Sequence, residues 1–200
     1  MQIKAKYKIA RRLGPAVFEK TQTQKFAARA SRKKEKYNRG ATDFGKALIE
    51  KQKARYTYII GEKQFKKYAE NANAEKVKKP EDSLYQAVEM RLDNVVARLG
   101  IATTRLAARQ IVNHGHISVN GRRVSIPSAH VVVGDVVSVV SRSRGSKLFA
   151  DVAERAKEFK VPEWLFFDPS KLEGKVISIP KLVPTELSFD IAGILDFYKR

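Results

Sequence analysis

The feature that most constrains the fold is residues 117–126, where apolar and polar side chains alternate on both sides of Asn120-Gly121. Alternation with a period of two is typical of a half-buried strand. An Asn-Gly pair between two such runs predicts a two-residue type I′ turn, because both residues tolerate positive φ. We therefore predict a β-hairpin with four apolar side chains facing a core: Ile117, Val119, Val124 and Ile126.

Helical patterns precede the hairpin. Apolar residues recur every three or four positions from Leu84 to Leu99, with Pro80 suited to the start of the run and Gly100 to its end. A further helix is predicted from a cap at Thr103 or Thr104 to a stop near residue 115.

Arginines follow this helical region, and carboxylates are rare in it. Arg105 and Arg109 lie four residues apart, so their side chains leave one face of the helix, and Arg98 is placed to join them. Asp93 and Asp135 are the only acids of residues 91–140. With a turn at 134–135 and a strand at 136–140, the segment is predicted to form two short helices and a small antiparallel sheet with a basic face.

Composition indicates a polyanionic partner. Forty Lys and Arg residues against 21 Asp and Glu residues give a net charge of +19 at pH 7. Such an excess repels itself in a compact state, and we expect nucleic acid to neutralise it. The sequence has no cysteine, no long apolar run, and no apolar stretch after its basic start, so we expect a cytoplasmic protein with no disulfide, signal peptide or transmembrane helix.

Residues 1–43 form a basic arm without a sustained hydrophobic period, in which four aromatic residues are interleaved: Tyr7, Phe18, Phe26 and Tyr37. Turns are expected at residues 14–15 and 38–40. We expect the arm to become ordered only when phosphates neutralise it. A solvated, flexible tail is the alternative, although such a tail has little use for aromatic side chains.

Two helices are predicted after the arm. Residues 40–47 resemble a phosphate-binding loop, but Ala47 stands where such a loop needs Ser or Thr, so we interpret Thr42 or Asp43 as a helix cap instead. The first helix is predicted at 44–60 with a stop at Gly61, and the second has an apolar stripe that begins at Phe65. Three lysines flank this stripe and are candidate phosphate contacts: Lys63, Lys66 and Lys67.

The last quarter of the chain is nearly neutral, with a net charge of −1 over residues 148–200. It predicts a helix at 147–160, a buried aromatic cluster around Trp164, a strand at 175–179 and a last helix at 187–198. We expect that helix to dock on another helix or on a partner protein.

Three stretches carry a resemblance to a known family: RLDNVVARLG at 91–100, TRLAARQIVNHGHISVNGRRVSIPS at 104–128, and VVVGDVV at 131–137. Together they closely resemble the RNA-binding module of small-subunit ribosomal protein four. Residues 54–68 are similar to the helical segment that precedes the module in that family, and residues 186–198 are similar to its C-terminal helix.

The resemblance implies an α+β fold in which a mostly helical domain, residues 44–90 plus 182–200, carries an inserted RNA-binding module at 91–147. Residues 148–181 extend the module. The family implies a structural constituent of the small ribosomal subunit that binds its RNA at a multi-helix junction, nucleates assembly, contributes to decoding accuracy, and lies near small-subunit proteins five and three where messenger RNA enters. No enzymatic activity is implied.

The sequence departs from the family pattern in two places. Many relatives bind zinc through N-terminal cysteines, and this chain has none, so it resembles the zinc-free bacterial type and we expect no metal and no cofactor. Residues 38–44 stand where many bacterial relatives have a Pro-Gly-Gln-His-Gly turn, so contacts of the arm cannot be transferred residue by residue.

The predicted RNA contacts are basic side chains on the helices and the hairpin, because folded RNA is recognised through its shape, phosphates and 2′-hydroxyls. The module residues are Arg98, Arg105, Arg109, His114, His116, Arg122, Arg123 and Lys147, and the helical-domain residues are Arg55, Lys63, Lys66 and Lys67. Arg122 and Arg123 are expected to point away from the core. The two histidines fit a second reading equally well, that of a turn satisfying its own backbone. A metal site is disfavoured, since only His130 remains as a third imidazole.

Two other functions share sequence features with this chain. Pseudouridine synthases carry a similar module and an Arg-Leu-Asp motif, but Arg91-Leu92-Asp93 opens the module itself and no separate catalytic domain is present, so Asp93 is interpreted as a helix-face charge near Arg91. A stress protein that rescues stalled ribosomes would not need the flanking helices. The prediction requires the arginines to lie on one side of the molecule without burial against carboxylates.

Overall fold

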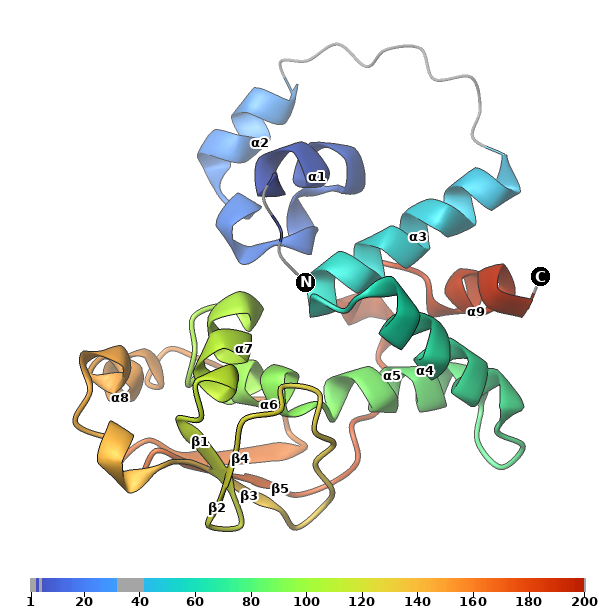
Figure 1. Ribbon diagram of the computed structural model, residues 1–200. Helices are drawn as coiled ribbons and strands as arrows, with labels where there is room; N and C mark the ends of the chain where they lie inside the picture. Colours follow the sequence, from blue (N-terminus) through green and yellow to red (C-terminus); the bar gives the residue numbers. More distant parts are fainter. Residues whose placement is uncertain (1–2, 4, 32–41, 200) are drawn as a thin grey trace. The chain divides into compact units, whose positions relative to one another are not determined.

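The computed structural model describes residues 3, 5–31 and 42–199 (Figure 1). They divide into two compact units: residues 1–85 with 182–200, and residues 86–181. The second unit is thus inserted in the chain between the two segments of the first. Helices and a five-stranded sheet together confirm the predicted α+β class.

Three helices build most of the first unit: α3 (Asp43–Tyr58), α4 (Glu62–Ala74) and α9 (Ile191–Lys199). Thr42, one of the two predicted alternatives, caps α3, because its hydroxyl accepts a hydrogen bond from the Gly45 amide. The predicted stop at Gly61 is wrong. The helix ends at Ile59, whose φ of 57° is left-handed, and Gly61 is instead the N-cap of α4.

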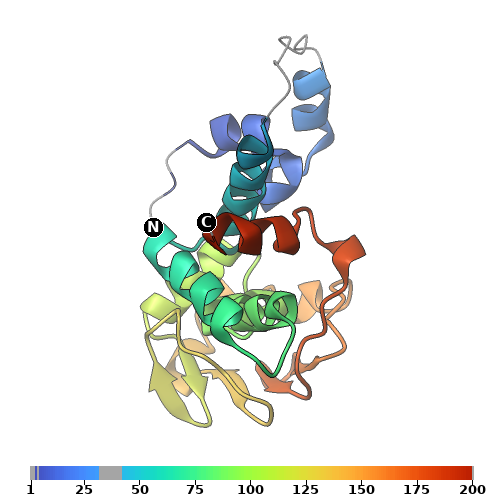
Figure 2. The ribbon, with the colours of Figure 1, turned by 90° about the vertical axis from the view of Figure 1, so that its right-hand side faces the viewer.

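Helix α9 packs on α3 and α4, which confirms that the last helix docks on other helices (Figure 2). It begins at Ile191, four residues later than predicted, after the short 3-10 helix η5 (Pro184–Glu186). No helix in the described part of the chain is long and apolar enough to cross a membrane.

The described part of the basic arm is folded, contrary to our expectation. It contains α1 (Lys6–Leu13), the 3-10 helices η1 (Pro15–Val17) and η2 (Glu19–Thr21), and α2 (Gln24–Ser31). Its aromatic residues Phe18 and Phe26 are buried in a small cluster that Ile49 and Tyr56 of α3 complete. The segment therefore has a small core of its own that α3 covers, which the local pattern does not reveal. The predicted turn at residues 38–40 and the aromatic Tyr37 lie outside the described residues.

The second unit is built on an antiparallel sheet with the strand order β2-β1-β3-β5-β4. The strands are β1 (Ile117–Val119), β2 (Arg122–Val124), β3 (Val136–Val139), β4 (Leu165–Asp168) and β5 (Glu173–Val176). Helices α6 (Leu92–Arg98) and α7 (Arg105–Asn113) lie against one face of this sheet (Figure 1). Their apolar side chains share one core with Ile117, Val137 and Val139.

The predicted hairpin is confirmed. Strands β1 and β2 pair with Ile117 opposite Val124, and the turn residues Asn120 and Gly121 have φ values of 50° and 78°. One predicted core position is wrong, since Ile126 is 60% exposed. It lies beyond the end of β2, where the alternation no longer positions a side chain.

The helical run between residues 80 and 100 is two helices rather than one. Helix α5 (Pro80–Glu89) ends before Arg91, which forms an isolated bridge with His130, and α6 begins at Leu92. The Leu92 amide donates to the Ala129 carbonyl, so a tertiary contact replaces the helical hydrogen bond at this point. Thr104 caps α7, as one of the two predicted alternatives.

The predicted helix at 147–160 is largely wrong. The structure has the 3-10 helices η3 (Ser141–Ser143) and η4 (Lys147–Phe149) and a single α-helical turn, α8 (Val152–Arg155). Trp164 is buried as expected, but the following residues form β4, and Phe166 is 58% exposed on it. Strand β5 begins two residues before the predicted strand, at Glu173.

Candidate nucleic-acid interface

The sharp break between α5 and α6 places a buried carboxylate among arginines. Arg91 donates to Asp93 through both Nε and Nη2, over 3.0 and 2.7 Å. Arg109 of α7 donates from Nη1 to the same carboxylate over 3.0 Å. Asp93 is 6% exposed. The expected proximity of Asp93 to Arg91 is confirmed, but the group is a buried link between α6 and α7 rather than a surface charge.

A second buried carboxylate extends this arrangement. Glu89 is fully buried and accepts two hydrogen bonds from Arg98, over 2.9 and 2.6 Å. Asn94 donates to Glu89 over 2.7 Å, and its own side-chain oxygen accepts from Arg105 Nε over 2.9 Å. Arg105 is therefore held to the same acid through an amide. We call the set Glu89, Arg91, Asp93, Asn94, Arg98, Arg105 and Arg109 the α6–α7 network.

Burial is distributed unequally within the α6–α7 network. The carboxylates of Glu89 and Asp93 are 0% and 6% exposed, whereas the side chains of Arg98 and Arg109 are 32% and 31% exposed. Arg91 is buried as well, at 3% exposed, so the positive charge reaches solvent through Arg98 and Arg109. We expected arginines without acidic partners, and this expectation is wrong. The structure nevertheless brings Arg98, Arg105 and Arg109 together around residues 89–94, as predicted.

Arg123, a predicted RNA contact on β2, makes two hydrogen bonds to the backbone after α7. Its Nε donates to the Gly115 carbonyl over 2.9 Å and its Nη2 to the His114 carbonyl over 3.2 Å, so it caps the end of α7. Gly115 has a φ of 71°, and a Cβ at this position would overlap the Arg123 guanidinium. Arg122, the neighbour of Arg123 at the turn, is exposed.

The histidines lie at the same end of α7. His116 Nδ1 is 2.9 Å from the Ser143 hydroxyl, and its ring packs edge-on against Phe149. Burial lowers the pKa of His116 below its ordinary value of 6.5, and the nearby charges of His114, Arg142 and Arg123 lower that pKa further. The structure thus gives His116 a side-chain partner instead of the turn backbone. His114 is exposed beside it, with the ring centroids 6.1 Å apart.

Lys147 is exposed at the start of η4, next to the basic stretch 141–147. Arg142 in this stretch is also exposed, and its charge acts on His116. Our residue prediction missed Arg142, although the run SRSRGSK marks the stretch as basic. It also missed Glu89 and Asn94, because no sequence signal separates a buried acid or amide from one on a helix surface.

Of the predicted residues of the first unit, Arg55 is largely buried and the three lysines are exposed. Arg55 is 12% exposed and donates to Glu62 over 2.7 Å, and Lys51 donates to the same carboxylate over 3.0 Å. Tyr198 donates to Glu62 over 2.7 Å and so ties α9 to α4. Of the three lysines on α4, Lys63 and Lys67 are exposed, and Lys66 lies 3.6 Å from Glu70. Arg55 is thus part of the packing of this unit.

The Glu62 cluster perturbs two pKa values. Burial alone would raise the pKa of Glu62, but hydrogen bonds from Tyr198 and Lys51 and the charges of Arg55 and Lys51 lower it below its ordinary value. Burial raises the pKa of Tyr198, and its hydrogen bond to Glu62 raises it further. The cluster therefore favours a carboxylate that is ionised and a phenol that is not.

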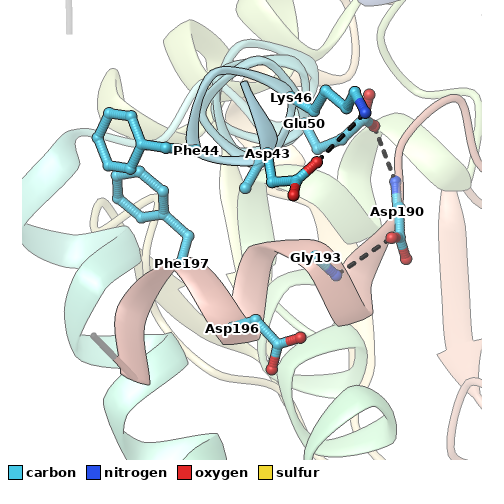
Figure 3. Close-up of a pocket in the computed structure, with 9 residues that line it drawn as sticks. Asp43, Phe44, Lys46, Glu50, Asp190, Gly193, Asp196 and Phe197 are labelled. Carbon is cyan, nitrogen blue, oxygen red and sulfur yellow. Dashed lines mark hydrogen bonds and ion pairs between the residues drawn. The ribbon is translucent and has the colours of Figure 1, made fainter. Parts of the chain in front are cut away.

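A pocket of about 240 Å³ lies between α3 and α9 of the first unit (Figure 3). The rings of Phe44 and Phe197 lie 5.3 Å apart at one side of it. Its remaining lining is mostly acidic, with one lysine: Asp43, Glu50, Asp190, Asp196 and Lys46. Carboxylates beside aromatic faces suit a cationic side chain.

No metal centre is formed within residues 3, 5–31 and 42–199, since no three His, Asp or Glu side chains there are placed to hold an ion.

The helix pair, the β1–β2 hairpin and the partly exposed Arg98 and Arg109 are typical of an RNA-binding module. Sequence comparison agrees, because the S4 domain matches residues 90–137. The domain described as ribosomal protein S4/S9 N-terminal domain matches residues 2–89.

Relatives that cover most of the chain are small-subunit ribosomal proteins. The small ribosomal subunit protein uS4 of Roseiflexus castenholzii is 39% identical over 201 residues, 96% of each chain. The uS4 proteins of Persephonella marina and Halothermothrix orenii are 44% and 46% identical, over 78% and 80% of this chain and 77% and 76% of theirs. The chain belongs to the uS4 family, whose members are structural proteins of the small ribosomal subunit and not enzymes.

Proposed function

We propose that this protein is a primary binder of small-subunit ribosomal RNA, that it recognises a multi-helix junction, and that its binding nucleates assembly of the subunit. One observation carries the proposal most directly. The α6–α7 network keeps its two carboxylates and Arg91 inside, and it leaves Arg98 and Arg109 32% and 31% exposed. RNA duplexes offer phosphates and 2′-hydroxyls on their surface, and oriented guanidinium groups recognise these groups.

The experiment is a filter-binding titration with deproteinised bacterial small-subunit ribosomal RNA over a range of salt concentrations. Neutralised phosphates release counterions, so log affinity should fall steeply and linearly with log salt. An unrelated RNA duplex of equal length in nucleotides should bind more weakly at every salt concentration. A flat salt dependence, or equal affinity for both RNAs, would contradict the proposal.

Nucleation of assembly is tested by order of addition. When the subunit is reconstituted from RNA and purified proteins without this chain, we expect other proteins to bind the same RNA region poorly. Adding the chain first should restore them, and adding it last should not. If the order makes no difference, the chain binds RNA without directing assembly.

We also propose, from the family resemblance, that small-subunit proteins five and three are neighbours, that messenger RNA passes nearby, and that the chain affects decoding accuracy. The acidic, aromatic pocket between α3 and α9 supports a protein neighbour that presents a basic side chain. A photo-crosslinking residue at Phe44 should form adducts with a small-subunit protein in assembled subunits. The same residue at Phe166, exposed in the other unit, is the comparison.

The proposed location is the cytoplasmic ribosome. The protein should remain with small subunits after a high-salt wash, at one copy per subunit in growing cells. A rescue factor would instead appear on ribosomes only under stress, and that outcome would overturn the proposal.

A further inference from the structure

Glu89 and Asp93 are buried carboxylates among the arginines of the α6–α7 network. Their presence in a protein that binds a polyanion needs a physical reason. Glu89 and Asp93 reduce the charge that RNA would meet, and burying them carries a desolvation cost. Each of them contacts arginines directly. The four arginines of the α6–α7 network against these two acids still leave a formal charge of +2.

We propose that Glu89, Asp93 and Asn94 are positioning residues for RNA recognition. They act through the arginines: Glu89 orients Arg98, Asp93 orients Arg109, and Asn94 orients Arg105. This inference rests on the proposed function, since it concerns how the same surface selects folded RNA.

The contacts to Arg98 fix the plane of its guanidinium. Two parallel hydrogen bonds from Nε and Nη2 to one carboxylate define both the position and the tilt of the planar group. Because Glu89 is fully buried, its own position is determined by the surrounding core. Arg98 is thereby held in place while a third of its side chain faces solvent.

Asn94 performs the same task for Arg105 without a charge. Its amide nitrogen donates to Glu89 and to the Glu89 backbone carbonyl, so the amide orientation is determined on that side. Its oxygen is then directed at Arg105 Nε, 2.9 Å away. An arginine held in this way loses less rotamer freedom when it binds a phosphate, and its geometry selects among RNA shapes.

A purely structural network predicts something different. In that case the substitutions would lower stability, and the folded fraction would bind RNA as before. Positioning predicts weaker specific binding by protein that is fully folded, with little change in binding to unrelated duplex.

The first experiment is a double-mutant cycle on RNA affinity, with purified bacterial small-subunit ribosomal RNA as the probe. Asn94→Ala should weaken binding three- to tenfold in the natural background and should lose most of that effect in an Arg105→Ala background, because it acts mainly through that arginine. An equal loss in both backgrounds would overturn the inference. Circular dichroism and thermal melting establish that each variant is folded at the assay temperature.

Arg105→Lys keeps the charge and tests the same point if Asn94→Ala does not fold. Lysine lacks the Nε–H that Asn94 accepts, so we expect weaker specific binding with an unchanged salt slope. Full affinity in this variant would show that charge alone suffices and would overturn the inference.

Glu89→Gln is the charge test, and exposed Glu163→Gln is its matched control because both raise the net charge by one. Glu163→Gln should leave the ratio of specific to non-specific affinity unchanged, whereas Glu89→Gln should lower it several-fold. Equal ratios in the two variants would overturn the inference. If the unsubstituted protein shows no preference for the ribosomal RNA, the proposed function itself fails, which is a separate result.

Discussion

The two units use buried ion pairs in opposite senses. In the first unit the cations are inside, since Lys51 and Arg55 are 8% and 12% exposed, and their acid Glu62 is 42% exposed. In the second unit the acids Glu89 and Asp93 are inside and Arg98 and Arg109 reach solvent, while Arg91 is buried beside Asp93. The same residue types thus stabilise packing in one unit and present positive charge in the other. Counting charges along the sequence does not distinguish the two cases.

The largest expected effect is on stability. Glu62→Ala should lower the free energy of unfolding by about 4 kcal/mol, because it leaves two buried cations without a counter-charge. Glu89→Ala should cost about 2 kcal/mol although Glu89 is the more buried acid, since the arginine it releases reaches water. Urea denaturation measures both, with Trp164 fluorescence following the second unit. A larger cost for Glu89→Ala would refute the comparison.

The capped end of α7 provides the next test. Gly115→Ala should cost about 2 kcal/mol, because it combines a φ of 71° with overlap of the Arg123 guanidinium. Gly121→Ala is the matched control. Its φ is 78° and nothing lies within 4 Å of an added Cβ, so it should cost about 1 kcal/mol. Equal costs in urea denaturation would mean that the Arg123 cap contributes nothing.

RNA affinity should depend on the partly exposed Arg109 and not on the buried Arg55. Arg109→Ala should weaken binding of small-subunit ribosomal RNA by about 1 kcal/mol, because this side chain is 31% exposed and uses one of its donors on Asp93. Arg55→Ala should leave the affinity of folded protein unchanged, since Arg55 is committed to Glu62. Filter binding at constant salt measures both. A loss from Arg55→Ala as large as that from Arg109→Ala would contradict the division of roles.

The smallest expected effect is the pH dependence that His116 contributes. The pKa of His116 is 6.5 in the unfolded chain and lower in the folded protein. Between the folded and the unfolded pKa, the unfolded chain therefore binds more protons than the folded protein. Stability should therefore rise with pH across that window and be fully present above 6.5. An NMR titration of the ring should give a pKa below 6.5, and His116→Gln should remove this contribution. A pKa above 6.5 would mean that burial does not dominate at this histidine.

Local patterns predicted much of the second unit. The Asn120-Gly121 turn, the Thr104 cap and the spacing of Arg105 and Arg109 depend on neighbours a few residues apart, and the structure shows each of them. The predicted helix at 147–160 is largely replaced by η4 and α8, and its buried residues Phe149 and Val152 pack in the same core as the sheet residues Val137 and Val139.

In the basic arm, local patterns missed structure that is present. Its described helices are short, and its core is completed by Ile49 and Tyr56 of α3, far along the chain. Its buried residues are spread over several short elements, so the segment has no sustained hydrophobic period. Reading its residues in order therefore suggested a flexible arm.

The sequence by itself determined the turn, the helix caps, the charge excess and the family, because each depends on residues that are close in the chain or on composition. The tertiary structure alone decided which charges are buried. Glu62 meets Tyr198 across 136 residues, and Asp93 meets Arg109 across two helices. Whether an arginine packs the interior or faces RNA depends on which carboxylate the folded chain brings beside it and on how much of each reaches water.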